Sequence, residues 1–221
     1  MPVEPGAPVE RLRLTFAVGG PARYASHLDL TRAWVRALRR LRAPLAYTRG
    51  FNPRARLSIA APLPVSFAGE RELLDVLFEA PVDARELEHR LRQELPAGLA
   101  LLEVAGVPLG APPLPSQVQA VDYVVSFLEP PPADLAARLA RLLEAESLPF
   151  TRLRQGKETR FDLRPRILEA RVEERAGVAA LALRLAHGPA GAARPEDVLQ
   201  ALGVPAESAR VTRTGLVLAE R

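Results

Sequence analysis

Short stretches of alternating apolar and polar residues predict strands in the first half of the chain. Residues 11–17 alternate in this way. Leu12, Leu14 and Phe16 share one face and polar side chains occupy the other, which is the pattern of a half-buried strand. The further predicted strands span residues 56–60, 72–79 and 99–104.

Apolar residues recur at helical spacing in two segments between these strands. The first helix begins after Ser26, a favourable N-cap, and Asp29 three positions later helps to initiate it. Its apolar stripe is Leu30, Trp34, Leu38 and Leu41. The second helix, within residues 81–98, repeats leucine every four residues and ends at proline and glycine. Residues 11–104 thus predict the order β-α-β-β-α-β of a ferredoxin-like domain.

The same order recurs in the second half, with one extra hairpin that turns at Gln155–Gly156. Two strands follow around the turn Ala176–Gly177, and Gly203 ends a short helix. The expected fold is α+β, with two tandem ferredoxin-like domains. Its parts are a disordered N-terminus at 1–10, a first domain at 11–104, a Pro-rich linker at 105–119 and a second domain at 120–221.

Composition narrows the chemistry that the chain can perform. Cysteine is absent, which excludes disulfides, thiol catalysis and a cysteine-held iron–sulfur cluster on this chain. The three histidines lie far apart, so we expect no metal and no cofactor of its own. The first ten residues lack a signal pattern, and no apolar run approaches the ~18 residues of a membrane span. A cytoplasmic protein without a membrane partner is expected.

The net charge of +4 and the pI of about 10.2 suggest an anionic partner, but local clustering is the better signal. No acidic residue lies between Asp29 and Glu70. The eight arginines of this basic tract are Arg32, Arg36, Arg39, Arg40, Arg42, Arg49, Arg54 and Arg56. On the helix they lie opposite the Trp34 stripe, where without carboxylates they repel one another. We interpret the tract as a phosphate-binding surface; a merely solvated basic face is the alternative.

A shaped loop and aromatic residues accompany the basic tract. Gly50 and Asn52 tolerate left-handed backbone geometry and Pro53 restricts its own φ, so the loop can aim N–H groups and arginines at a phosphate. Tyr24, Tyr47 and Phe51 are candidates to stack on RNA bases, or to pack beneath the loop. His27 is the one histidine in this setting, and it is either a general acid/base, a reader of substrate, or structural.

A second basic segment, "KETRFDLRPRI", lies in the predicted hairpin of the second half. Lys157, the only lysine of the chain, Asp162 and Arg164 form a possible second-domain contact. The spacing of Asp162 and Arg164 predicts an ion pair on one strand face.

These motifs together resemble a known bacterial family of unknown function, the radical SAM-linked proteins. The matching residues are Arg23, the run SHLDL at 26–30, Arg39, Arg40, Tyr47, the run GFNP at 50–53, PLP at 62–64 and DLRP at 162–165. The chain departs from the family pattern at Thr48, at Arg54-Ala55 and at Ser66-Phe67. The resemblance implies an accessory role beside a separate radical SAM protein, which would hold the iron–sulfur cluster and S-adenosylmethionine. The tandem layout is also similar in architecture to the RAMP-type CRISPR endoribonucleases.

The leading hypothesis is a non-catalytic protein that binds RNA, such as tRNA or rRNA, for a radical SAM enzyme. Its expected nucleic-acid-binding residues are Arg23, Tyr24, Arg32, Arg36, Arg39, Arg49, Phe51, Asn52, Arg54 and Arg56. One alternative is a metal-independent endoribonuclease with His27 as its catalytic acid/base. The other is a protein–protein adaptor that docks the radical SAM partner through the basic tract.

Overall fold

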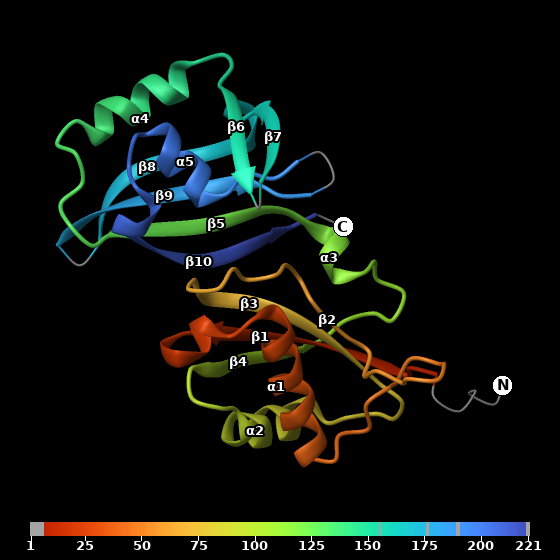
Figure 1. Ribbon diagram of the computed structural model, residues 1–221. Helices are drawn as coiled ribbons and strands as arrows, with labels where there is room; N and C mark the ends of the chain where they lie inside the picture. The colour runs from red at the N-terminus through yellow and green to blue at the C-terminus, as the bar shows by residue number, and fades with distance from the viewer. Residues whose placement is uncertain (1–6, 155, 176, 189–190, 220–221) are drawn as a thin grey trace. The chain divides into compact units, whose positions relative to one another are not determined.

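The computed structural model describes residues 7–154, 156–175, 177–188 and 191–219, and it confirms the α+β class (Figure 1). The chain divides into two compact units, residues 1–118 and 119–221. Each unit has its own strands and helices.

Unit 1 contains an antiparallel sheet in the order β4-β1-β3-β2. Its strands are β1 (Glu10–Val18), β2 (Leu57–Ile59), β3 (Ala68–Phe78) and β4 (Leu99–Gly106). Its helices are the 3₁₀ turn η1 (Gly20–Tyr24), α1 (His27–Arg40), α2 (Ala84–Glu94) and the short α3 (Leu114–Gln117). All four predicted strands are present. However, β3 begins four residues earlier than the pattern indicated, and β1 begins at Glu10 inside the expected N-terminal tail.

Helices α1 and α2 cover one face of this sheet, as Figure 1 shows. The predicted start of α1 is confirmed, because the Ser26 hydroxyl accepts a hydrogen bond from the Asp29 N–H at 3.2 Å. Trp34 is completely buried and packs edge-on against Phe16 of β1, with ring centroids 4.9 Å apart. Alternation along β1 therefore places one row of side chains under α1.

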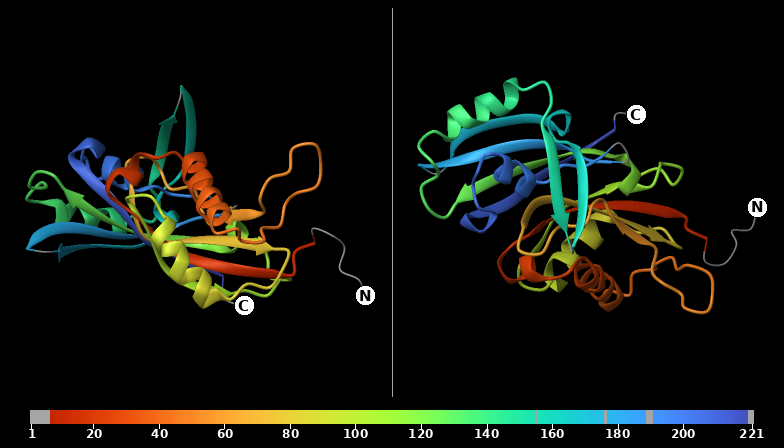
Figure 2. Two further views of the ribbon diagram at one scale, coloured as in Figure 1. Left: turned by 90° about the horizontal axis from the view of Figure 1, so that it is seen from below. Right: turned by 45° about the horizontal axis from the view of Figure 1, so that its top comes forward.

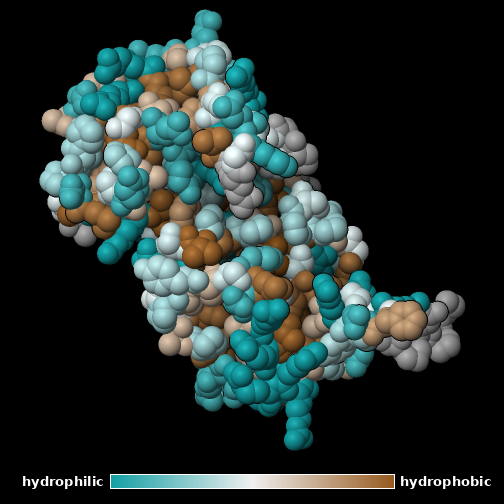
Figure 3. Space-filling view, viewed as in Figure 1, coloured by the Kyte–Doolittle hydropathy of each residue, from teal (hydrophilic) through white to brown (hydrophobic). Residues whose placement is uncertain are grey.

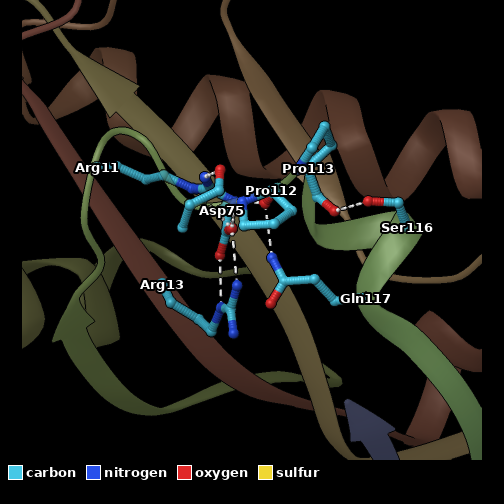
Figure 4. Close-up of polar contacts among 8 residues, drawn as sticks. Arg11, Arg13, Asp75, Pro112, Pro113, Ser116 and Gln117 are labelled. Atoms are coloured by element: carbon cyan, nitrogen blue, oxygen red, sulfur yellow. Dashed lines mark hydrogen bonds and ion pairs between the residues drawn. The ribbon is translucent and has the colours of Figure 1, made fainter. Parts of the chain in front are cut away.

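The opposite face of β1 buries charge instead of exposing it (Figure 4). Asp75 is only 2% exposed and binds two arginines, at 2.5 Å from Arg11 and 2.7 Å from Arg13. Arg11 also donates to the carbonyl oxygens of Ala111 and Pro112, at 2.6 and 2.9 Å. The segment expected to be a linker at 105–119 thus packs on unit 1: β4 runs to Gly106, and residues 107–117 carry these carbonyls and helix α3.

Unit 2 has a sheet in the order β10-β5-β9-β8 and a separate two-stranded hairpin, β6-β7. Its strands are β5 (Val118–Phe127), β6 (Pro149–Arg154), β7 (Lys157–Asp162), β8 (Ile167–Arg175), β9 (Val178–Ala186) and β10 (Ala209–Leu218). Its helices are α4 (Leu135–Glu144), α5 (Pro195–Ala201) and the 3₁₀ turns η2 (Arg164–Arg166) and η3 (Ala206–Ser208). The extra hairpin is confirmed. Of its turn residues, Gln155 lies outside the described residues, as does Ala176 of the next turn.

Candidate nucleic-acid interface

Helix α1 has the two unlike faces that the sequence predicts. Leu30, Trp34 and Leu38 are buried, whereas Arg32, Arg36 and Arg39 are exposed. Hydrophilic side chains gather over α1 and α2 in the space-filling view (Figure 3). The exposed face of α1 is therefore basic along most of its length.

Some arginines of the basic tract have acidic partners. This corrects the expectation from sequence that the arginines on the helix have no carboxylate nearby. Arg40 forms an ion pair with Glu94 of α2 at 2.5 Å, because the fold brings a carboxylate from 54 residues away. Arg32 lies 3.4 Å from Asp29, one turn earlier on the same helix. The Ser26 hydroxyl, with a smaller contribution from Arg32, lowers the pKa of the Asp29 carboxyl below its usual 3.8. Within the described residues, the Arg36 side chain has no hydrogen bond or ion pair.

The loop after α1 folds back on itself as a narrow hairpin that stands away from the helix and strands of unit 1 (Figure 2). The Thr48 N–H donates to the Arg54 carbonyl at 2.8 Å, and the Arg54 N–H donates to the Thr48 hydroxyl at 3.0 Å. The Arg56 N–H donates to Ala46 at 2.8 Å. Gly50, with φ of 121°, lies at the tip and adopts a conformation that few other residues tolerate. We call residues 46–56 the tip loop.

The two aromatic residues of the tip loop have different environments. Phe51 is fully exposed. Tyr47 is partly buried, and its hydroxyl accepts a hydrogen bond from Arg39 at 3.1 Å, while the Arg39 guanidinium lies 5.6 Å from the ring centroid. Arg39 and Tyr47 therefore tie the tip loop to α1, and Phe51 is left at the surface.

The remaining predicted residues of the tip loop precede or follow Phe51 in sequence by one to five positions. Arg49, Asn52 and Arg54 are exposed, and Arg56 is partly exposed. In the part of the chain that the structure describes, no protein group binds the guanidinium of Arg54 or Arg56. An exposed aromatic ring thus lies in a loop that also carries cationic side chains available to a ligand.

Arg23 and Tyr24 lie at the opposite end of α1 from the tip loop. The fourteen residues of α1 span about 21 Å, so Tyr24 and Phe51 cannot contact the same base. Arg23 donates to the Ser66 carbonyl at 2.9 Å and its own carbonyl accepts the Ser66 N–H at 2.8 Å, so it holds the 62–67 loop in place. Tyr24 is 65% exposed beneath the Arg23 guanidinium.

His27 is the first residue of α1 and is exposed. Its carbonyl accepts the Thr31 hydroxyl at 2.9 Å, but among the described residues nothing hydrogen-bonds to its imidazole. A general base normally needs a second group that orients it. The structure shows no such group here.

The second-half candidates separate into one exposed and two structural residues. Lys157 is exposed on β7. The Asp162 carboxylate accepts the N–H groups of Leu148 at 2.8 Å and Arg164 at 3.0 Å, and chiefly the Leu148 bond lowers the pKa of Asp162 below 3.8. The Arg164 guanidinium donates to the carbonyls of Leu143 and Ile167 instead. The predicted Asp162–Arg164 ion pair is wrong, because Arg164 lies in a 3₁₀ turn beyond the strand.

Sequence analysis missed the buried ion pairs that hold each unit together. Arg152 of β6 binds Asp197 at the start of α5, and the Asp197 side chain is only 5% exposed. Two guanidinium groups lie close to the ring of Phe161, with their central carbons 4.8 Å (Arg152) and 4.0 Å (Arg166) from its centroid. The sequence signal was a pair of acidic residues at a helix start, Glu196 and Asp197, which does not identify the partner of either one.

The described residues contain no group of three or more His, Cys, Asp or Glu side chains that could hold a metal ion. None of the helices there combines the length and the apolar character needed to cross a bilayer.

Comparison with known proteins places the chain in a family without a known activity. No curated protein matches the chain. Residues 11–195 match the model of a family described as "Uncharacterized protein conserved in bacteria (DUF2344)". This agrees with the expected bacterial family of unknown function, whereas the radical SAM association stays a prediction. Because the match covers most of its length, the chain belongs to this uncharacterised bacterial family.

Proposed function

We propose that this chain is a non-catalytic accessory protein that binds single-stranded RNA along the exposed face of α1 and the tip loop. The observation that carries the proposal is Phe51, a fully exposed aromatic side chain in a loop with free cations. A soluble protein gains nothing for its own fold from such a side chain. Base stacking on an aromatic ring is worth about 1–3 kcal/mol, and this stacking accepts any base.

The exposed cations of α1 and the tip loop suit the regularly spaced phosphates of an RNA strand. Arg36 and Arg54 are exposed guanidinium groups on two different segments, as a chain of phosphates requires. The loop backbone is held by its own hydrogen bonds, so little order has to be gained on binding. Arg39 also has a positioning role, because its Nε–H donates to the Tyr47 hydroxyl of the tip loop.

The arrangement of strands is consistent with two ferredoxin-like domains. In each unit the first and third strands of the β-α-β-β-α-β order lie in the middle of the sheet. We propose that both units have this fold, with β6-β7 inserted in the second. The fold is compatible with RNA binding but does not imply it.

The partner in this proposal is a radical SAM enzyme that modifies the bound RNA. Support for this partner comes from the resemblance of the motifs alone. Since the chain has no cysteine, the partner would supply the iron–sulfur cluster and S-adenosylmethionine.

Fluorescence anisotropy with a labelled, unstructured RNA, in EDTA and at two salt concentrations, tests the proposal. We expect binding that weakens steeply with salt and falls about tenfold in Phe51→Ala. The matched control is Leu153→Ala, which truncates an apolar side chain that is 70% exposed on the unit 2 hairpin. Equal affinity of the wild type and Phe51→Ala would contradict the proposed surface.

The same samples separate the two alternatives. Shortened RNA in EDTA that disappears in His27→Ala would identify the endoribonuclease. A protein partner that stays bound after nuclease treatment, without RNA binding by the chain itself, would identify the adaptor.

A further inference from the structure

Helix α1 ends in a turn that places an arginine where glycine is usual. The Arg42 N–H donates to the Arg39 carbonyl at 2.9 Å, and the Ala43 N–H donates to the Leu38 carbonyl at 3.1 Å. This pair of bonds defines the Schellman motif, whose turning residue adopts a left-handed conformation. Arg42 has φ of 54°, and for a residue with a Cβ atom this conformation is strained.

Helix α5 ends in the same turn with the expected residue. The Gly203 N–H donates to Gln200 at 3.0 Å, the Val204 N–H donates to Leu199 at 2.9 Å, and Gly203 has φ of 70°. One chain therefore contains the same helix ending twice, once without strain and once with it. Any benefit of arginine at position 42 has to come from its side chain.

The fold itself does not use the Arg42 side chain. Arg42 is exposed, and no hydrogen bond or ion pair of its guanidinium occurs within the described residues. It lines an open hollow of about 210 Å³ between the end of α1 and the start of α2. The two carboxylates in that hollow have other partners: Asp83 accepts N–H groups of α2, and Glu86 lies 3.3 Å from Arg90.

We infer that Arg42 is a further phosphate contact of the RNA-binding surface, an inference that rests on the proposed function. At this end of α1, Arg39 is engaged with Tyr47 and Arg40 with Glu94, whereas the Arg42 guanidinium, four residues before the tip loop in sequence, has no partner among the described residues. Residues held in strained backbone conformations cluster at functional sites, such as those where a side chain binds a ligand. A guanidinium with five donors is suited to phosphate oxygens.

Arg42→Gly tests this inference because it removes the strain and the charge together. We expect a melting temperature raised by a few degrees, an RNA affinity lowered several-fold, and a log–log salt slope reduced by about one. Arg42→Lys keeps the strain and the charge and should retain most of the affinity. Arg141→Gln, which removes an exposed charge from α4, controls for net charge.

The outcomes distinguish this inference from the proposed function. If the wild type binds RNA and Arg42→Gly binds it equally well, Arg42 is not a contact. A lower melting temperature in Arg42→Gly would mean that the arginine serves the fold, which also overturns the inference. If the wild type does not bind RNA at all, the proposed function fails first and the inference fails with it.

Discussion

Two segments of the chain are rich in arginine and contain a phenylalanine, yet the structure uses them in opposite ways. In unit 2, the guanidinium groups of Arg152 and Arg166 both lie against the Phe161 ring, and both donate to the Ala192 carbonyl. In unit 1, Phe51 is fully exposed, and no protein group among the described residues binds the guanidinium of nearby Arg54. The first arrangement holds a hairpin in place, and the second leaves its ring and charge available to a ligand.

The difference arises from the partners that the fold supplies. Asp197 and the 192–194 segment come close to the base of the hairpin, so arginines there have acceptors inside the protein. The tip loop contains no carboxylate, and its Thr48 and Tyr47 hydroxyls already accept from the Arg54 N–H and from Arg39. A cluster of arginines in a sequence therefore indicates a ligand-binding surface only if the fold does not supply those arginines with acceptors inside the protein.

The largest expected effect is the loss of the buried ion pair in unit 2. Asp197→Ala leaves the Arg152 guanidinium without its carboxylate and also removes an acceptor for the Arg194 N–H, so we expect unfolding free energy to fall by about 3–5 kcal/mol. Urea denaturation measures the change. Arg160→Ala, at an arginine side chain that is 82% exposed, is the control and should change little. A loss below about 1 kcal/mol in Asp197→Ala would show that the pair does not hold the hairpin.

The second largest effect is a difference in stability loss between the two phenylalanines when each is truncated to alanine. Phe161→Ala removes a ring that contacts two guanidinium groups and Phe150, and should cost about 2 kcal/mol of stability. Phe51→Ala should change stability by less than about 0.5 kcal/mol, because the ring has no packing to lose. Chemical denaturation of both variants checks this. Similar losses of stability in the two variants would contradict the conclusion that Phe161 supports the fold and Phe51 does not.

A smaller effect is expected at the end of α1. Arg42→Gly should raise the unfolding free energy by up to about 1 kcal/mol, because glycine adopts the left-handed conformation without strain, although its unfolded chain is more flexible. Gly203→Ala is the reciprocal variant in α5 and should lower stability by a similar amount. Thermal unfolding of both variants compares the two helix ends directly. A lower unfolding free energy in Arg42→Gly would contradict the claim that the left-handed conformation of Arg42 is strained.

The smallest expected effect is the contribution of Asp162, at the base of the hairpin, to the loss of stability at low pH. Hydrogen bonds, chiefly from the Leu148 N–H, lower the pKa of Asp162 in the folded protein. Protons then bind the unfolded state more readily, so this contribution to stability is present above about pH 4 and is lost as the pH falls through the folded pKa. Asp162→Asn should flatten the decline of the urea midpoint below pH 4. An unchanged slope would show that Asp162 contributes no acid sensitivity.

Local patterns anticipated the elements of the interface well. The Ser26 cap, the buried stripe of Trp34 and the exposed face with Arg36 all follow from residues within one helix. The turn at Gly50 likewise depends on the conformational freedom of one residue. Such features are readable because the interactions that create them join neighbours in the chain.

The partners of the arginines were decided by tertiary structure. Arg40 meets Glu94, and Arg11 meets Asp75 and the carbonyls of 111–112, across separations of 54 or more residues. Strand alternation predicted that Arg11 lies opposite the helix-facing row, but not that residues 107–117 cover it. Likewise, the sequence showed Tyr47 and Phe51 in one loop. Only the structure showed that Tyr47 hydrogen-bonds to Arg39 of α1, whereas Phe51 is exposed.

The sequence by itself determined most of the strands and helices, that α1 has a basic face and an apolar face, and that a glycine-containing loop follows it. Only the tertiary structure decided that residues 114–117 form α3, which charges are neutralised and which aromatic ring is exposed. It also decided that α1 ends on a strained arginine to which no protein group among the described residues binds. The physical reason is range. Backbone propensity and amphipathic spacing act over a few residues, whereas an ion pair depends on where the rest of the chain places its opposite charge.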